Sequence, residues 1–212
     1  MERRELLKMI ALATGGTLIG GELFFSGCKS STSGTVTFTP ETIAFLDEVA
    51  ETIIPATATP GAKAAMVGEF MKVYVTDCYK EPEQKIFLAG VDKLNEACNK
   101  MHGHDFMKAP ADHRKALLAA LDKEAKEVQD KRNKTEDEYV KSERAKGNHL
   151  PIQDYDNPVP PHYFTLMKQL TLLGFFTSKT GATETLRHIQ VPGKYDGALP
   201  YKKGDKAWAD SI

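Results

Sequence analysis

The apolar residues of this chain recur every three or four positions, which is the spacing of one face of an α-helix. Between Phe87 and Met101, the steps through Val91, Leu94 and Cys98 are 4, 3, 4 and 3 residues. No stretch of any length alternates apolar and polar residues with the period of two that a half-buried strand needs. The sequence therefore predicts a mostly α fold, a small bundle of about five helices.

Proline, glycine and hydroxyl residues mark where these helices begin and end. At Thr39-Pro40 a hydroxyl N-cap precedes proline at the first helical position, and Pro55 ends the same helix. A His-Gly turn at 102–103 and a proline-rich loop at 149–161 separate later helices. The expected helices cover about 40–53, 62–79, 82–101, 112–128 and 162–173.

The segment from Asp122 to Lys146 carries eight basic and eight acidic residues and almost no apolar stripe. It is either a solvated extension of the fourth helix or a mobile insertion. The whole chain has a net charge of −1, so there is no basic excess that would bind nucleic acid or an anionic membrane. We therefore expect no nucleic-acid partner.

The N-terminus has the features of an export signal. Arg3 and Arg4 precede apolar residues and a lysine, as in a twin-arginine signal, and an apolar run of 13 residues follows from Met9 to Gly21. That run is too short to cross a bilayer of about 30 Å as a helix. Ser26-Gly27-Cys28 then resembles a lipobox. The alternatives are an arginine pair that occurs by chance on an ordinary signal, or an uncleaved anchor.

These features predict three parts of the chain. Residues 1–28 form the twin-arginine and lipoprotein signal with Cys28 as the lipidated residue, residues 29–37 form a flexible tether, and residues 38–212 form the helical domain. The protein is then expected on the periplasmic side of a membrane, held there by its lipid. In such an oxidising compartment Cys78 and Cys98 either pair as a disulfide or stay free.

The C-terminal segment from Gly174 differs from the rest, because its aromatic residues lie among glycines and prolines. Such residues fit poorly into a helix bundle, so the sequence predicts an irregular arm. The arm either packs back on its own domain or docks on another protein, since Tyr, Trp and Phe are favoured in interface cores.

Catalytic and cofactor motifs are scarce. His102-x-His104 with Asp105 is the best candidate for a metal site, but two histidines on a glycine turn without a third ligand are more often a polar surface turn. His113, His149, His162 and His188 are scattered along the sequence. We find no nucleophile motif, no glycine-rich dinucleotide fingerprint and no Cys-x-x-Cys pair. The sequence thus predicts no catalytic residue, cofactor or metal in this chain alone.

The C-terminal segment resembles the signature of the gluconate 2-dehydrogenase subunit 3 family. Its matching residues are Gly174-Phe175-Phe176-Thr177-Ser178-x-x-Gly181, Leu186 and Pro192-Gly193-x-Tyr195-x-Gly197. Ile53-Ile54-Pro55, Pro60-Gly61-Ala62, Gly103 and Phe106 are similar to its upstream pattern, so the resemblance runs from about Phe38 to Trp208. His188 stands where a tyrosine is common, and Ala198 where a cysteine is common, which removes any disulfide of that cysteine.

The resemblance implies a small accessory subunit of an exported flavin-dependent dehydrogenase. In that family a large partner of the glucose-methanol-choline type binds FAD and oxidises a sugar, sugar acid or polyol, and a c-type cytochrome usually takes the electrons. The small subunit supplies the export signal. An exported lipoprotein that acts alone as a scaffold is the alternative. The resemblance implies partner contacts at Phe175, Phe176, Thr177, Ser178, Gly181, Pro192, Gly193, Tyr195 and Trp208.

Overall fold

The computed structural model describes residues 38–148, 155–191, 193–194 and 197–209. The expected export signal with Arg3 and Arg4, the lipidation site Cys28 and the tether lie outside the described residues. So do two of the expected partner contacts, Pro192 and Tyr195. What the sequence predicts for these positions stays a prediction.

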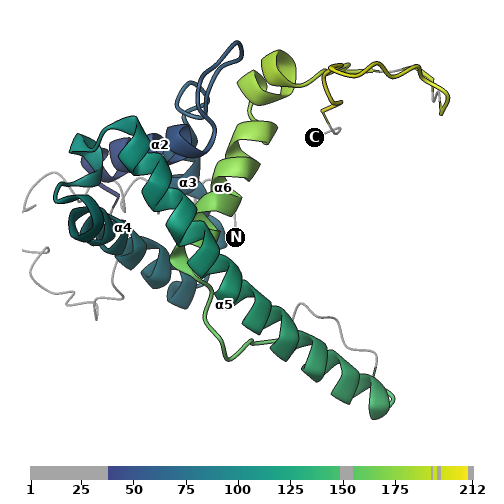
Figure 1. Ribbon diagram of the computed structural model, residues 1–212. Coiled ribbons are helices and arrows are strands. Elements are labelled where there is room, and N and C mark those ends of the chain that lie inside the picture. Colours follow the sequence, from purple (N-terminus) through teal and green to yellow (C-terminus); the bar gives the residue numbers. More distant parts are fainter. Residues whose placement is uncertain (1–37, 149–154, 192, 195–196, 210–212) are drawn as a thin grey trace, which may run out of the picture. The chain divides into compact units, whose positions relative to one another are not determined.

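The described part of the chain is mostly helical, as the apolar spacing predicts (Figure 1). Within it there is no strand, and one isolated parallel bridge joins Arg187 to Trp208. None of the helices in these ranges is long and apolar enough to cross a membrane. The elements are α2 (Pro40–Ile53), α3 (Val67–Cys78), α4 (Glu81–His102), η1 (Phe106–Lys108), α5 (Ala111–Ala145), α6 (Tyr163–Thr177) and the short π-helical turn η3 (Gly181–Thr185).

Two helix termini follow directly from the local sequence. The Thr39 hydroxyl accepts a hydrogen bond from the backbone N–H of Thr42 at 3.2 Å, so the predicted N-cap of α2 is confirmed. Gly103 ends α4 in the left-handed conformation, with φ of 77°, which glycine adopts without steric cost.

The start of the second helix was predicted wrongly, because α3 begins at Val67 rather than at Ala62. Carboxylates from α2 hold the intervening residues as turns. Glu51 accepts backbone N–H groups at 2.8 and 2.9 Å from the loop that follows α2, and Asp47 accepts the Gly68 N–H at 2.7 Å. These carboxylates satisfy backbone donors of the loop and of the first turn of α3 that have no partner within a helix.

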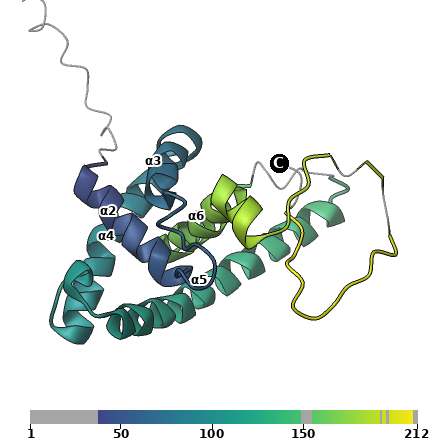
Figure 2. The ribbon, with the colours of Figure 1, turned by 90° about the horizontal axis from the view of Figure 1, so that it is seen from above.

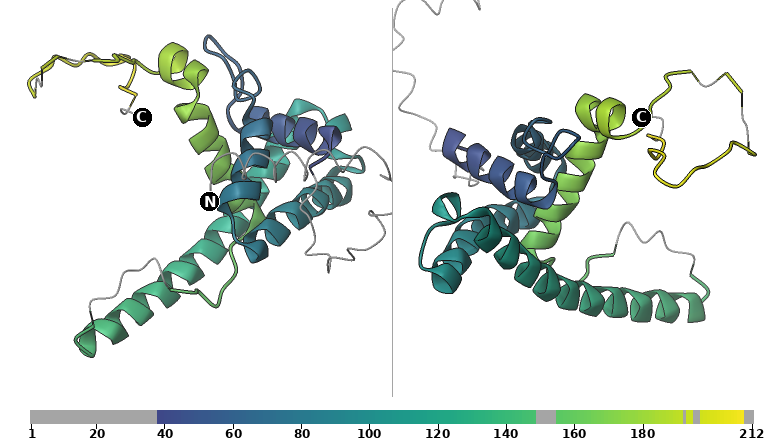
Figure 3. Two further views of the ribbon diagram at one scale, coloured as in Figure 1. Left: turned by 180° about the vertical axis from the view of Figure 1, so that it is seen from behind. Right: turned by 45° about the horizontal axis from the view of Figure 1, so that its top comes forward.

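The core lies around α6, which packs against α2, α3, α4 and α5 (Figure 3). Its own inward side chains meet large apolar residues from every one of these helices. The fully buried members include Leu46, Val49, Met71, Phe87, Leu94, Leu117, Phe164 and Met167.

The charged segment from 122 to 146 is an extension of α5, which decides between the two alternatives (Figure 2). Ala125 is the last buried residue of this helix. Beyond it, Tyr155 and Asn157 of the proline-rich loop contact the helix: the rings of Tyr155 and Tyr139 stack with centroids 4.2 Å apart, and Asn157 donates to the Arg132 carbonyl at 3.0 Å.

Cys78 and Cys98 are both free thiols, so the disulfide alternative is not formed in this structure. Cys78 is exposed at the end of α3, whereas Cys98 lies in the core and burial raises the pKa of its thiol.

Candidate functional site

The second half of α6 has no charged residue, since none lies between Lys168 and Lys179. A helix without charges on any side is normally covered on every side. Part of this helix is nevertheless exposed. The exposed positions follow the helical spacing i, i+3, i+4, i+7 and i+8 and form one continuous face, which we name the α6 stripe: Gln169, Leu172, Leu173, Phe176 and Thr177.

The α6 stripe is apolar at its centre and has a neutral polar residue at each end. Leu172 and Leu173 are each 40% exposed and Phe176 is 39% exposed. The Thr177 hydroxyl donates to the Leu173 carbonyl at 2.7 Å, so this polar group is satisfied within the helix. Between Gln169 and Thr177 the stripe therefore presents carbon to solvent without a charge to compensate it.

Phe175 does not belong to this surface, although the family resemblance implies a partner contact there. Its side chain is only 1% exposed and joins the core. The reason is that α6 continues to Thr177 instead of ending at Leu173. Gly174 lies on the buried face, where a Cβ atom would be 2.5 Å from Cδ1 of Phe70.

Ser178 and Gly181 shape the end of α6. The Ser178 hydroxyl donates to the Phe175 carbonyl at 2.7 Å and accepts the Gly181 N–H at 3.0 Å. A Cβ atom on Gly181 would lie 1.9 Å from the Phe175 carbonyl oxygen, so only glycine fits there. Gly181 is buried and Ser178 is half-buried, so both have an internal role, and the partner contacts expected at them stay predictions.

Residues 187–209, which we name the C-terminal loop, leave η3 and return to their own start (Figure 2). The Arg187 N–H donates to the Ala207 carbonyl and the Ala209 N–H donates to the Arg187 carbonyl, both at 2.8 Å. The Arg187 guanidinium lies 3.9 Å from the centre of the Trp208 ring. The expected irregular arm is confirmed, with Gly193 and Trp208 exposed.

The histidine turn at 102–104 contacts a third histidine, which the sequence does not indicate. His113 of α5 stacks on His102 with ring centroids 4.1 Å apart, and its Nδ1 lies 3.2 Å from Nε2 of His104. Burial, followed by the neighbouring His113 and His104, lowers the pKa of His102. In the described ranges no group of His, Cys, Asp and Glu side chains is arranged to hold a metal ion. A stack of this kind has no sequence signal beyond the shared residue type.

A sequence model of one protein family, described as gluconate 2-dehydrogenase subunit 3, matches residues 40–193. The chain belongs to this family. As a family member it is an accessory subunit of a dehydrogenase complex and associates with a larger dehydrogenase subunit. The matched range includes the α6 stripe and ends within the C-terminal loop. No curated protein and no solved structure matches the chain.

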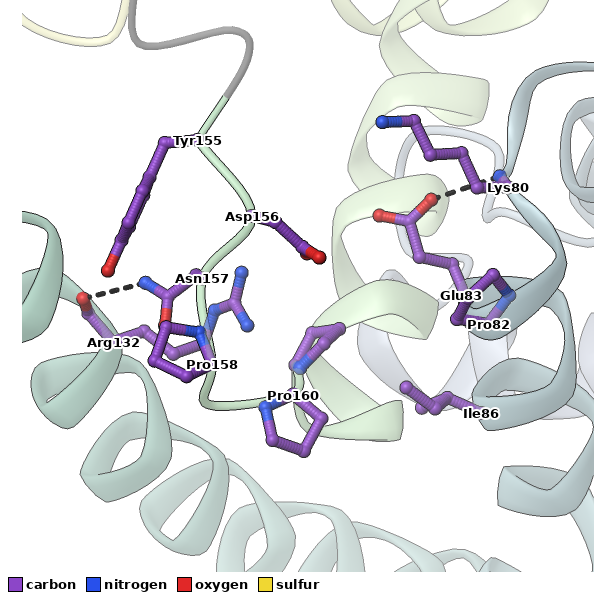
Figure 4. A pocket seen from close by; sticks show the side chains of 11 residues that line it. Lys80, Pro82, Glu83, Ile86, Arg132, Tyr155, Asp156, Asn157, Pro158 and Pro160 are labelled. Carbon is purple, nitrogen blue, oxygen red and sulfur yellow. Dashed lines mark hydrogen bonds between the residues drawn. The ribbon is translucent and has the colours of Figure 1, made fainter.

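A crevice of about 370 Å³ lies between the start of α4, α5 and the proline-rich loop (Figure 4). Two of its charged side chains make hydrogen bonds within the chain: Glu83 accepts the Lys80 backbone N–H at 3.1 Å, and Arg132 donates to the Val159 carbonyl. The charges in it, of Lys80, Glu83, Arg132 and Asp156, are of mixed sign. Among the described residues that line this crevice there is no Ser, Thr or Cys side chain that could act as a nucleophile.

Proposed function

We propose that this chain is the non-catalytic small subunit of an exported, membrane-associated, FAD-dependent dehydrogenase of the gluconate 2-dehydrogenase type. The α6 stripe is where it binds the larger subunit. The observation that carries the proposal is an uncharged, exposed face on the central helix of the bundle. Exposed apolar faces of this kind are typical of protein–protein contacts.

The exposed apolar area of the stripe is large enough to contribute measurably to binding affinity. Burying a whole Leu or Phe side chain stabilises by about 1.5–3 kcal/mol. Leu172, Leu173 and Phe176 are each about two-fifths exposed, so covering all three contributes roughly 2–4 kcal/mol. That corresponds to a factor of about 30 to 1,000 in affinity.

The catalytic parts belong to the partner in this proposal. The larger subunit is of the glucose-methanol-choline type, binds FAD and oxidises a sugar, sugar acid or polyol, and a c-type cytochrome takes the electrons. The small subunit contributes export through Arg3 and Arg4, assembly through the α6 stripe, and membrane attachment through a lipid on Cys28. Because a single acyl chain binds membranes weakly, stable attachment requires more than one.

The test compares two surface variants in co-expression with the larger subunit. Leu172→Asp with Leu173→Asp places two carboxylates in the stripe, and we expect binding to weaken by at least about a hundredfold, since each buried unpaired charge costs several kcal/mol. The matched control is Met101→Asp at the end of α4, where the side chain is 51% exposed and lies outside the stripe.

Affinity is measured with the purified partner by surface plasmon resonance, and the fold of each variant by circular dichroism. The control should bind as the unmodified chain does. The proposal fails if the unmodified chain does not bind the flavoprotein, or if the stripe variant folds and binds with unchanged affinity.

A further inference from the structure

The C-terminal loop is rich in exposed apolar side chains although it has little packing of its own. Val191 is 78% exposed and Tyr201 is 76% exposed. Single exposed apolar residues are ordinary, but several within one loop favour contact with another surface. Among its described residues, the exposed large apolar ones are Ile189, Val191, Leu199, Tyr201 and Trp208.

The same loop is basic. Residues 187–209 carry a net charge of +3 in a chain whose net charge is −1. The basic residues are Arg187, Lys194, Lys202, Lys203 and Lys206, and the acidic ones are Asp196 and Asp205. A surface that complements this loop is therefore apolar and acidic.

The two ends of the loop are held together. The backbone bonds of Arg187 to Ala207 and Ala209 close it, and the guanidinium covers the Trp208 ring at 3.9 Å. A cation over a tryptophan face contributes about 0.5–1 kcal/mol at an exposed site. Closing a flexible loop in advance removes part of the ordering cost that binding would otherwise carry.

The loop is also tied to the helix that carries the stripe. Lys206 donates to the Glu184 carbonyl in η3, and η3 packs against α6. The turn between α6 and η3 is fixed by Ser178 and Gly181. The base of the loop is thereby connected to the end of the α6 stripe through a short, well-bonded segment.

We propose that the C-terminal loop is a second docking element for the larger dehydrogenase subunit and binds an apolar, acidic patch on it. Arg187 and Trp208 are its positioning residues, because they close the base of the loop. This inference rests on the proposed function for its partner, and adds to it a separate contact of stated charge. An anionic membrane would also attract lysines beside aromatics, but a lipid surface adapts to an open loop and requires no fixed base.

The first experiment measures the affinity of the full chain for the purified larger subunit. Arg187→Ala and Trp208→Ala should each weaken binding about tenfold, mainly by faster dissociation. Trp208→Phe retains an aromatic face under the guanidinium and should restore affinity to within about threefold. The melting temperature of the isolated subunit should change little in all three variants, which a purely structural role would not allow.

The second experiment tests the charge. Lys202→Glu with Lys203→Glu should weaken binding about tenfold at low salt and less at high salt, because exposed charges are screened. The matched control is Lys131→Glu with Lys134→Glu on the exposed face of α5, which should leave the affinity unchanged. Vesicles containing anionic phosphatidylserine provide the membrane comparison.

Unchanged affinity in the loop variants, alongside a loss in the α6 stripe variant, overturns this inference and leaves the proposed function standing. A loss of vesicle binding without a loss of partner binding also overturns it, in favour of a lipid surface. If the unmodified chain does not bind the larger subunit, both proposals fall together.

Discussion

Two glycines near the end of α6 make close contacts of different kinds. A Cβ on Gly181 would meet the backbone carbonyl of Phe175 at 1.9 Å, whereas one on Gly174 would meet the Phe70 ring at 2.5 Å. A side chain can turn away, but a backbone carbonyl that is part of the helix end cannot. We therefore expect Gly181→Ala to lower the free energy of unfolding by about 3 kcal/mol and Gly174→Ala by about 1 kcal/mol.

Urea unfolding followed by circular dichroism measures both values. Thr183→Ala, on the exposed side of η3, is the control and should be close to neutral. An equal cost at the two glycines would show that the contact at Gly181 relaxes as readily as a side chain does.

His102 gives the stability of the fold a dependence on pH. Burial and then the adjacent His113 and His104 lower the pKa of His102 below its usual value of 6.5. The unfolded chain therefore binds a proton at this residue at a higher pH than the folded chain does. His102 therefore leaves stability unaffected well above pH 6.5 and lowers it as the pH drops below that value.

The measurement is the urea midpoint at pH 7.5 and at pH 5. His102→Gln should reduce the loss between these two values, because glutamine has no proton to gain. His188→Gln, at an exposed histidine, should lose as much stability as the unmodified chain. The same loss in all three proteins would place the sensitive group elsewhere.

At the scale of elements, the two halves of α5 differ in how they are stabilised by contacts with the rest of the domain. Up to Ala125 its apolar face lies in the core, and beyond Ala125 no residue is buried. We expect amide hydrogens of residues 130–145 to exchange far faster than those of 114–125, because they open locally rather than with the whole domain. Hydrogen exchange read by mass spectrometry on peptides from each half measures the difference, and equal protection would mean that the extension is held by contacts beyond the loop at 155–161.

How much of this architecture could be predicted depends on the distance at which each determinant acts. Thr39-Pro40 and Gly103 act within one turn, so the ends that they define were predicted correctly. The start of α3 was not, because Asp47 caps it from 21 residues upstream. A capping contact between two helices has no local signature.

The end of α6 shows a signal that was available but misread. The expected helix ends at Leu173, just before Gly174, although glycine also marks close packing, here against Phe70. With the helix continued, Phe175 falls four residues after Thr171 on the buried face, and Phe176 falls with Leu172 and Leu173 on the exposed one. The spacing alone would then have separated the core aromatic from the surface aromatic. The contact of His113 with His104 and the closure of the C-terminal loop had no such signal.

At the scale of the whole molecule, the expected export signal of this chain predicts in which compartment the partner is found. If the small subunit carries the folded flavoprotein out of the cytoplasm, then Arg3→Lys with Arg4→Lys should leave both proteins inside, because the export route reads the arginine pair. Cell fractionation with immunoblotting measures where each protein is, and Lys8→Gln is the control with an intact pair. Normal export of the flavoprotein from cells with the double variant would contradict the escort role.

The α6 stripe also has a consequence for copies of this chain that are made in excess of the larger subunit. A copy made in excess of its partner keeps Leu172, Leu173 and Phe176 in water, on a face with no charge to discourage contact with other copies. Chaperones and proteases recognise exposed apolar surfaces of this kind, so an unassembled copy would be refolded or degraded. If the α6 stripe is the binding face, as we propose, it would in this way also keep the supply of the two subunits in balance.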